Sequence, residues 1–306
     1  MKIGISGIKG FVGTNLEKRL SSDFKVFGVT RKPNRATNLY PYDDISSVMN
    51  KCGVFLHLAG KAHDLKNTAN PEDYFTVNTK LTETLFEEFL ASDCKIFIHF
   101  SSVKAVTDKV NGILTEDAIP DPQTVYGKSK LEAENYILGK NIPEGKKFYI
   151  LRPCLMHGKN NKGNLKLLYS FVKKGLPYPL GAFSNKRSYL SIDNLEFLIR
   201  QLMIKQPESG IYNIADNTPV STTELITTIG KSIGKKARVF HIPKICIRIL
   251  AKIGTLLRLS FNTEKLDKMT ENYVVSNTKI KSALAIELPF TAIEGLENTF
   301  SSMNEE

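Results

Sequence analysis

The stretch Lys2-Ile3-Gly4-Ile5-Ser6-Gly7-Ile8-Lys9-Gly10-Phe11-Val12-Gly13 opens the chain and decides its fold. Residues 2–6 form a short, mostly apolar run, which predicts a strand. Three glycines follow at once, and apolar residues at helical spacing continue through Leu16 and Leu20. A strand, a glycine-rich turn and a helix in this order are the parts of a dinucleotide-phosphate site.

Each glycine has its own expected role in such a site. Gly7 allows the tight turn off the strand, Gly10 lets the backbone approach a pyrophosphate, and Gly13 lets the helix pack close to the sheet. The free N–H groups and the positive end of the helix dipole then face the phosphates. The spacing is G-x-x-G-x-x-G rather than G-x-G-x-x-G, and the alternative is a turn without a ligand. The position between a strand and a helix favours the cofactor site.

Length and composition narrow the class of protein. With 306 residues and 42% hydrophobic residues, the chain can form one large α/β domain and a smaller lobe. No C-x-x-C pair occurs among the four cysteines, which disfavours a zinc ribbon or a disulfide framework, so we expect a cytoplasmic protein without a metal. Met1 leads directly into a strand that the fold needs, which disfavours a cleaved leader. No apolar run is long enough to span a bilayer.

The formal charge of +11 raises the question of an anionic partner. The lysines are scattered along the predicted helices, and no basic run with interleaved aromatic residues occurs. We therefore expect a lysine-rich solvated surface and no nucleic-acid partner. A positive field would also help to gather a polyanionic small substrate.

The first half of the chain alternates between predicted strands and helices. The longest helix is expected over residues 72–92. After the first strand, the further strands are expected at residues 25–30, just before 43, and at 54–58, 95–100 and 148–151. This alternation predicts a Rossmann-like, doubly wound parallel sheet in an α/β fold, covered by helices on both faces.

Beyond about residue 155 the rhythm changes. We expect residues 1–155 to form the dinucleotide-binding domain, with some later segments returning to it, and residues 156–306 to form mainly a smaller C-terminal substrate-binding lobe. In this second part, strands are expected at 211–214 and 237–242, and helices at about 165–174, 222–233, 245–257 and 291–300.

One of these helices carries three bases four residues apart, at Lys244, Arg248 and Lys252, with isoleucines and leucines opposite. One interpretation is peripheral membrane contact through residues 244–258. The interpretation that we favour from sequence alone is a helix packed on the lobe with a hydrated basic edge, and no stable membrane insertion.

The end of the second strand bears on the choice of cofactor. An acid at this place in a dinucleotide fold hydrogen-bonds the adenosine ribose of NAD, whereas an arginine can accept the extra phosphate of NADP. Thr30 and Arg31 stand there, so the sequence favours NADP(H) over NAD(H). A surface arginine without this role is the alternative.

Ser102, Tyr126 and Lys130 form the candidate catalytic set. Tyr126 and Lys130 are four residues apart at a predicted helix start, so they share a face. A neighbouring ammonium is expected to lower the pKa of the Tyr126 phenol, which could then exchange a proton with a sugar hydroxyl or carbonyl. Ser102, at the end of a neighbouring strand, can hydrogen-bond the same oxygen. Hydride transfer on a nicotinamide ring and proton transfer on the tyrosine together interconvert alcohol and ketone.

These motifs together resemble an extended short-chain dehydrogenase/reductase of the NAD-dependent epimerase/dehydratase family, which acts on nucleotide sugars. The resemblance runs through most of the chain, more thinly after residue 240, and is specific for fold and cofactor but not for substrate. The matching stretches are residues 6–13, 57–60, Asn78, 100–102, 126–130, 151–153 and 187–195.

The resemblance implies a role for each matching residue. Tyr126 and Lys130 would be the catalytic pair, with Ser102 as third member and Ser101 as the alternative if the register slips by one. Asn78 would be a structural helix residue near the site, and Asp44 would lie with Ile45 by the adenine. The residues implied to bind the cofactor are Gly7, Lys9, Gly10, Phe11, Val12, Gly13, Arg31, Asp44, Ile45, Leu58, Ala59, Gly60, Asn78, Tyr126, Lys130 and Pro153.

On the substrate side, the resemblance implies that Asn164 and Leu165 contact a diphosphate and that Leu180 and Gly181 lie by a uracil. Arg187 would pair with the diphosphate, because guanidinium is a forked donor to phosphate oxygens. Ser102 would also contact the sugar.

The chain departs from the family pattern at three places, one of which is the usual aromatic-glycine pair, replaced here by Val106 and Thr107. In the 4,6-dehydratases an acidic pair follows the third catalytic residue, whereas Val103 and Lys104 stand here, which disfavours a dehydratase. A second diphosphate-binding arginine near the C-terminus has no clear counterpart. The sequence leaves three candidates for that base, Arg258, Lys265 and Lys268.

Three hypotheses of function remain. The first is reduction of the C4 ketone of a UDP-2-acetamido-2,6-dideoxy-hexos-4-ulose in capsule or O-antigen biosynthesis, because residues 57–63 and 180–188 resemble such enzymes and Arg31 fits NADPH. The second is a UDP-glucose or UDP-N-acetylhexosamine 4-epimerase with the same catalytic set. The third is a non-catalytic dinucleotide-binding protein, which the survival of both Tyr126 and Lys130 disfavours. A homodimer is an open alternative to a monomer.

Overall fold

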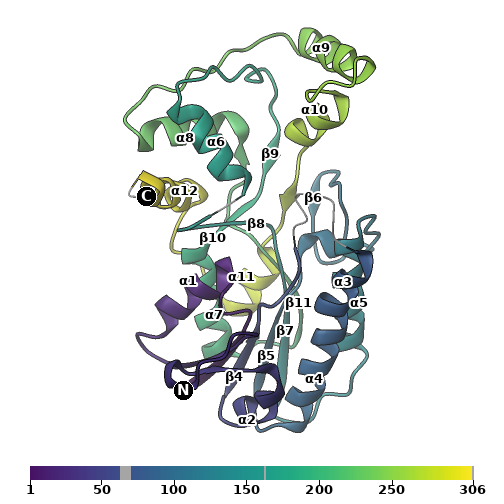
Figure 1. Cartoon of the computed structure of the whole chain (residues 1–306), viewed down its shortest axis with the longest axis vertical. Helices are drawn as coiled ribbons and strands as arrows, with labels where there is room; N and C mark the ends of the chain where they lie inside the picture. Colours follow the sequence, from purple (N-terminus) through teal and green to yellow (C-terminus); the bar gives the residue numbers. More distant parts are fainter. Residues whose placement is uncertain (63–69, 162, 305–306) are drawn as a thin grey trace.

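The structure, a computed structural model, describes residues 1–62, 70–161 and 163–304. A seven-stranded sheet forms its centre, in the order β11-β7-β5-β4-β1-β2-β3, and every neighbouring pair is parallel (Figure 1). These strands are β1 (Lys2–Ser6), β2 (Lys25–Val29), β3 (Leu39–Tyr40), β4 (Val54–His57), β5 (Ile96–Phe100), β7 (Lys147–Pro153) and β11 (Gly210–Ile214). The order reverses between β1 and β4, which confirms the doubly wound α/β fold predicted from the sequence.

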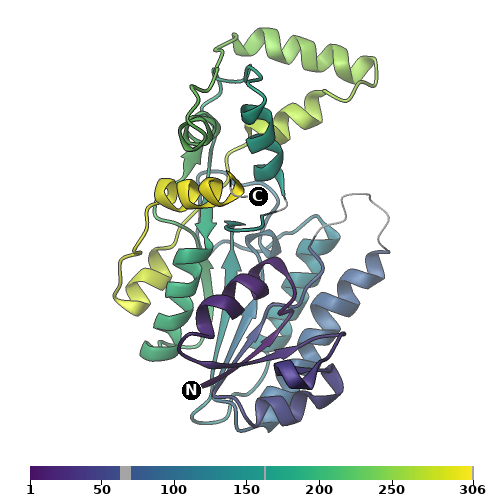
Figure 2. The same cartoon turned by 60° about the vertical axis from the view of Figure 1, so that its left-hand side comes forward.

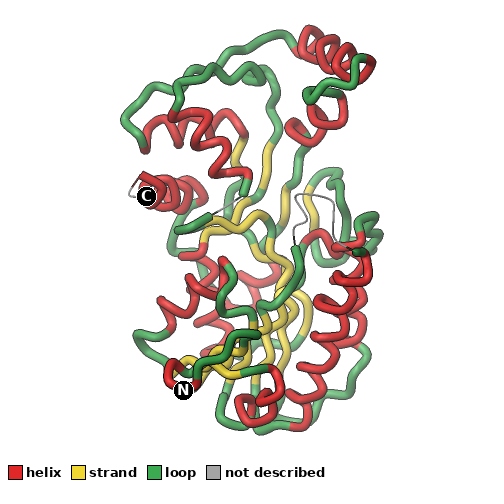
Figure 3. The backbone as a smooth tube through the Cα atoms, viewed as in Figure 1, coloured by secondary structure: helices red, strands yellow, loops and turns green. Residues whose placement is uncertain are grey.

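Both faces of the sheet are covered, because successive side chains of a strand point to opposite sides. On one face Val54, Leu56 and Ile98 pack with α1 (Phe11–Leu20), α7 (Ile192–Lys205) and α11 (Thr278–Leu284). On the other face, Phe55 and Phe97 pack with α2 (Ile45–Met49), α4 (Leu81–Ala91) and α5 (Val125–Leu138). Figure 3 shows the strands enclosed between the two sets of helices. Near-continuous apolar strands are the expected consequence of burial on both faces.

The predicted elements of the first half are present with small differences. The helix expected over 72–92 consists of α3 (Pro71–Phe75), a π-helical turn, η3 (Thr76–Lys80), and α4. The 3-10 turns η1 (Arg35–Thr37), η2 (Tyr42–Asp44) and η4 (Val103–Ala105) follow strands or precede helices. The π turn lies beside the candidate catalytic residues, where such interruptions of a helix often occur.

The second half contains elements that belong with the sheet. The strand predicted at 211–214 is β11, which extends the main sheet next to β7. The strand predicted at 237–242 is wrong: this segment makes only isolated bridges, Tyr178 with Val239 and Leu180 with His241. The sequence did not predict α2, α7, α11 or α10 (Thr263–Thr270).

Three helices of the second half enclose a separate apolar cluster that includes Tyr169, Leu225 and Phe300. They are α6 (Asn164–Lys173), α8 (Thr222–Ser232) and α12 (Ala292–Asn304). The remaining strands pair two by two and are β6 (Ile113–Leu114) with β13 (Val274–Val275), β8 (Leu155–His157) with β10 (Tyr189–Ser191), and β9 (Lys186–Arg187) with β12 (Val220–Ser221). From this part α9 (Lys244–Leu256) and α10 extend to the end of the molecule opposite the N-terminus (Figure 2). The division at residue 155 stays a prediction.

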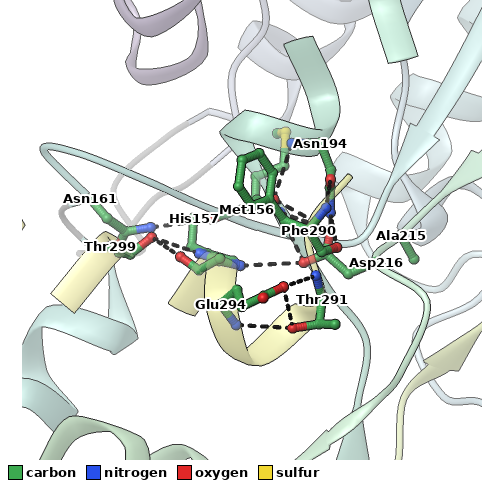
Figure 4. A network of polar contacts seen from close by, with 12 residues as sticks. Met156, His157, Asn161, Asn194, Ala215, Asp216, Phe290, Thr291, Glu294 and Thr299 are labelled. Carbon is green, nitrogen blue, oxygen red and sulfur yellow. Dashed lines mark hydrogen bonds and ion pairs between the residues drawn. The ribbon is translucent and has the colours of Figure 1, made fainter. Parts of the chain in front are cut away.

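A buried polar network joins the sheet side to the second half (Figure 4). The Asp216 carboxylate accepts from the Ser191 backbone N–H and from Asn194 Nδ2, at 3.2 and 2.7 Å. His157 Nδ1 and Thr299 Oγ1 are 2.8 Å apart, which connects β8 to α12. These side chains are almost fully buried, so their mutual hydrogen bonds replace lost hydration and fix the start of α7.

None of the helices in the described ranges is long and apolar enough to cross a membrane. All four cysteines are unpaired, and only Cys246 is exposed.

Candidate active site

The glycine-rich turn has the geometry that its sequence predicts. Gly7 has φ +70°, and a Cβ there would lie 2.6 Å from the Ala59 nitrogen. A Cβ at Gly13 would lie 2.4 Å from the Gly7 carbonyl oxygen, so only glycine lets α1 approach the turn this closely. Gly10 precedes α1 without a side-chain cap among the described residues, and the first turn of α1 has no acid. The N-terminal N–H groups of α1 therefore suit a phosphate.

The end of β4 forms the adjoining wall. Leu58 donates its backbone N–H to the Ser6 carbonyl at 3.2 Å, which keeps the chain next to β1. At Gly60 a Cβ would lie 3.2 Å from both Asn78 Oδ1 and Lys130 Nζ. The turn after β4 thus lies close to the start of α5, where a side chain at Gly60 would crowd Asn78 and Lys130. Residues present at the mouth of the first turn fit a dinucleotide.

Asn78 holds this wall in position. Its side chain accepts the Lys61 N–H at 2.8 Å and donates to the Lys61 carbonyl and to Ser129 Oγ, both at 3.0 Å. Thr79, the next residue in the π turn, donates to the Ser129 carbonyl at 2.9 Å. Asn78 is fully buried and connects three segments, as a structural helix residue would.

The structure brings together Ser102, Tyr126 and Lys130. The Ser102 hydroxyl acts on the Tyr126 phenol and lowers its pKa against the larger effect of burial. Tyr74 contacts the Tyr126 ring edge-on, with the ring centres 6.5 Å apart. Ser101 does not take this place, because its hydroxyl donates to the buried Glu134 carboxylate. Of the two serines considered, Ser102 is the one positioned beside the phenol.

The electrostatics of the pair differ from the sequence expectation. Burial raises the pKa of the Tyr126 phenol, and the Ser102 hydrogen bond opposes this only in part. The expected lowering by Lys130 is not observed, because the ammonium donates instead to the Phe100 carbonyl at 2.7 Å. Burial lowers the pKa of Lys130 to about 8, against the opposing attraction of Glu134. A phenol with a raised pKa keeps its proton at neutral pH.

Beneath this pair lie charged and polar groups that the sequence did not reveal. Glu134 forms a forked, fully buried ion pair with Arg152, with N–O distances from 2.5 to 3.2 Å. His57, hydrogen-bonded to Ser6 and Thr82, is held neutral because burial and then Lys130 lower its pKa to about 3. Glu134 and Arg152 are 18 residues apart on different elements, so no local spacing could have indicated the ion pair.

The loop after β2, where the adenosine is expected, contains two arginines, Arg31 and Arg35, of which only Arg31 was predicted to contribute. Arg31 is exposed after β2, as expected, and both Arg31 and the Gly7 backbone act on the Tyr42 phenol. Asp44 is paired with Arg35 at 2.5 Å. Arg35 and Tyr42 were missed because neither belongs to a motif, although each lies in a loop that follows one of the predicted strands.

The predicted substrate residues are more dispersed. Asn164 is exposed and Leu165 half-buried at the start of α6, whereas Leu180 is buried in the second apolar cluster. Gly181 packs against Val239 and Phe240. Arg187 pairs with Glu271 at 3.2 Å and donates to the Lys268 carbonyl.

Lys104 is a further basic residue near Arg187 and Glu271. Arg187 and Glu271 both act on the pKa of the Lys104 ammonium, which burial lowers. Lys104 lies 4.4 Å from the Tyr273 ring centre. Ser102 Oγ accepts the Lys104 backbone N–H at 3.2 Å, so this base follows directly on the catalytic set.

Pro153 ends β7 opposite Ile214, and Lys9 and Phe11 flank Gly10 in the turn. His63, the last residue of the stretch 57–63, lies outside the described residues. Within the described ranges no group of three or more His, Cys, Asp or Glu side chains could hold a metal ion.

Comparisons with known proteins agree with this geometry. The model of the NAD dependent epimerase/dehydratase family matches residues 3–215. UDP-glucose 4-epimerase of Vibrio cholerae is 30% identical over 96% of this chain and 93% of its own. N-acetyl-alpha-D-glucosaminyl-diphospho-ditrans,octacis-undecaprenol 4-epimerase of Escherichia coli O157:H7 is 26% identical over 96% and 92%. The solved UDP-N-acetylglucosamine 4-epimerase of Bacillus cereus superposes with a TM-score of 0.78, at 18% identity over 98% of each chain.

Proposed function

We propose that this chain, which belongs to the NAD dependent epimerase/dehydratase family, inverts the configuration at C4 of a UDP-linked hexose or N-acetylhexosamine. The observation that carries the proposal is that the Ser102 hydroxyl acts on the Tyr126 phenol and that Lys130 lies next to Gly60, at the edge of the sheet where the glycine turn opens. Ligands of doubly wound sheets bind at this carboxyl edge, at the point where the strand order reverses.

The cofactor expected in this family is NAD(H) or NADP(H). Gly7, Gly10 and the N-terminus of α1 would hold its pyrophosphate, and Gly60 and Lys130 its nicotinamide ribose. When bound, a nicotinamide accepts and returns a hydride. Leu58 and Ala59 are the small and apolar wall against which such a group can lie.

The chain's own part in the reaction is to move one proton. Tyr126 accepts the proton of the C4 hydroxyl during oxidation and returns it to the C4 oxygen during reduction. Ser102 orients that oxygen. To stabilise the phenolate, the Lys130 ammonium must leave the Phe100 carbonyl and turn toward the phenol while it is still charged. We therefore expect activity to depend on this ammonium, whose pKa burial lowers to about 8.

The diphosphate would lie between α6 and Arg187. Arg187 must then exchange its partner Glu271 for phosphate oxygens, which a forked guanidinium can do without leaving its place. Asn164 and Leu165 at the start of α6 would contact the same group, and Lys104 is a second base nearby. The backbone at Leu180 and Gly181 would line the uracil side.

The epimerase is favoured over other activities of the family by two points. Both relatives named above are 4-epimerases, and both align over nearly the whole of the two chains. No acid pair follows Ser102, because Val103 and Lys104 occupy the positions, so elimination of water lacks its acid and base.

A second candidate is the reductase of a UDP-2-acetamido-2,6-dideoxy-hexos-4-ulose in surface polysaccharide biosynthesis. Arg31 and Arg35 at the adenosine end favour it, because two bases there suit the additional phosphate of NADPH. Such a sugar nucleotide is made and used in the cytoplasm, which matches the compartment expected from the dispersed cysteines. A non-catalytic role remains the minor alternative.

The test is incubation of the purified protein with UDP-glucose, UDP-N-acetylglucosamine and a UDP-4-keto sugar, each with NAD⁺ or NADPH, followed by NMR of the products. We expect interconversion of C4 epimers without net consumption of cofactor. Stoichiometric NADPH oxidation with the keto sugar alone would favour the reductase, and binding without turnover would favour the non-catalytic alternative.

Tyr126→Phe should lower kcat by about 10²–10⁴-fold, the usual contribution of a proton-transferring side chain. Tyr74→Phe is the matched control, because it removes the hydroxyl of the neighbouring ring, whose centre lies 6.5 Å from that of Tyr126, and leaves the proposed proton donor in place. Equal losses in both variants would contradict the assignment of Tyr126.

A further inference from the structure

Much of the net positive charge of the chain lies in one segment. Between Glu224 and Glu264 there is no acid. The segment contains eight bases, all of them exposed: Lys231, Lys235, Lys236, Arg238, Lys244, Arg248, Lys252 and Arg258. These eight charges compare with a net charge of +11 for the whole chain, so the segment dominates the field of the molecule.

The same segment exposes apolar side chains. We call residues 240–259, which include α9, the basic arm. It contributes eight of the eighteen exposed large apolar side chains in the described part of the chain. They are Phe240, Ile245, Ile249, Leu250, Ile253, Leu256, Leu257 and Leu259, with exposed fractions from 45% to 82%. Isolated exposed apolar residues are common, but a contiguous set is not.

The helix α9 has three distinct faces. Ile247, Ala251 and Gly254 are buried toward the rest of the protein. Ile245, Ile249 and Ile253 follow each other at intervals of four on the opposite, exposed side, as helical geometry requires. The bases at 244, 248 and 252 form a stripe along one border of this apolar face.

The arm is an ordered part of the fold. A Cβ at Gly254 would lie 1.8 Å from the Phe261 carbonyl oxygen, so α9 and the chain leading to α10 cross at the closest approach that glycine allows. Thr255 Oγ1 accepts the Thr263 N–H at 3.1 Å and lies 3.0 Å from its hydroxyl. The exposed apolar face is therefore presented by a fixed hairpin, far from the sheet (Figure 2).

Charge decides which partner can cover this face. Two copies of the arm facing each other would bring four bases against four, which like-charge repulsion opposes. A nucleic acid would neutralise the bases but leave the isoleucines and leucines in water. An anionic lipid surface offers phosphate for the basic stripe and hydrocarbon for the apolar face.

We propose that the basic arm docks the enzyme on a bilayer that contains anionic lipids. With 13 residues α9 is about 20 Å long, shorter than the roughly 30 Å hydrocarbon core, so it lies in the plane of the interface rather than across it. The sequence favoured a helix packed on the lobe with a hydrated basic edge. The structure bears this out only for the face of Ile247 and Ala251, since Ile245, Ile249 and Ile253 are exposed.

The experiment uses the thiol of Cys246, the exposed one of the four cysteines, on the arm itself. The full-length protein labelled there with an environment-sensitive fluorophore is titrated with vesicles of phosphatidylcholine alone or with phosphatidylglycerol. We expect a blue shift and co-sedimentation with the anionic vesicles, weakening with added salt. No partition onto anionic vesicles at low salt by the folded protein would overturn the proposal, as would equal partition onto neutral vesicles.

Variants separate the two contributions. Ile249→Glu should weaken partition at least about tenfold, because it places a charge in the apolar face that would enter the bilayer. Lys252→Gln should weaken it about fivefold, as expected for one base near an anionic surface. Ile204→Glu, on α7 and 72% exposed, is the matched control and should change nothing.

Two outcomes point elsewhere. Equal losses in the control and in the arm variant would refute a specific face. Dimerisation in ultracentrifugation that Ile249→Glu abolishes would assign the face to a second copy and also overturn the proposal. Because the readout is binding and not turnover, failure here leaves the proposed epimerase untouched.

Discussion

Replacement of Glu134 by Gln tests whether the buried ion pair supports both the fold and the active site. Glu134 and Arg152 expose 0% and 2% of their side chains, and the carboxylate also accepts from Ser101. Removing its charge leaves the Arg152 guanidinium buried without a counter-ion. Nη1 of that guanidinium already lacks a hydrogen-bond partner in the described structure, so the arginine has no alternative acceptor at hand.

The expected loss is about 3–5 kcal/mol of unfolding free energy, the usual result of breaking a buried pair by removing one partner. With an unfolding entropy of about 2.1 cal/mol/K per residue, this lowers Tm by about 5–8 °C. Calorimetry and urea unfolding followed by circular dichroism measure it, since the chain has no tryptophan to report by fluorescence.

The same substitution has an effect on catalysis with a definite sign. Glu134 is the charge that raises the pKa of Lys130, against the larger lowering by burial. Without it the pKa of Lys130 falls further below about 8, so the ammonium is lost at lower pH. The alkaline limb of the pH–kcat profile should therefore move toward acid in Glu134→Gln.

The control is the double variant Glu134→Leu with Arg152→Met, which removes both charges and keeps the volume. A buried ion pair replaced by apolar groups is usually close to neutral in stability, so the double variant should recover most of the loss. A single variant that loses less than about 1 kcal/mol, or a double variant no better than the single, would refute the reasoning.

Three further predictions follow from burial. Lys130→Met should abolish turnover and yet raise the unfolding free energy at pH 7 by about 3 kcal/mol, because the pKa of Lys130 is about 8 in the folded protein and 10.5 in the unfolded chain. Denaturation at several pH values should show this gain shrinking as the pH rises from 8 to 10.5. Gly13→Ala should cost about 1–3 kcal/mol and weaken NADH binding measured by fluorescence, whereas Gly53→Ala, whose Cβ would meet nothing closer than 3.5 Å, should bind NADH normally. A thiol reagent at pH 8 should titrate Cys246 promptly and the other three cysteines only after unfolding, because burial raises the pKa of each buried thiol; more than one prompt thiol would contradict the burial.

Several features of the site follow from the sequence alone. The glycine turn could be predicted because the conformation of Gly7 and the close approach at Gly13 depend only on the missing Cβ. Tyr126 and Lys130 could be paired because helical geometry relates residues four apart. The strands could be placed because burial on both faces makes them apolar throughout.

Other features depend on contacts between distant segments. The resemblance implied a structural role for Asn78 but not its contacts, since its partners Lys61 and Ser129 are 17 and 51 residues away. The choice between Ser101 and Ser102 rests on Glu134, which takes the first hydroxyl. No local pattern contains that information.

The order of residues by itself thus determined the doubly wound fold and the glycine turn, and it singled out Tyr126 as the proposed proton donor, because each rests on local geometry or on periodicity. Only the tertiary structure decided the electrostatic state of that donor. Burial raises the pKa of Tyr126 and lowers that of Lys130, and the ammonium donates to the Phe100 carbonyl rather than to the phenol. Desolvation is a property of everything packed around a group, so no neighbour in the sequence can reveal it.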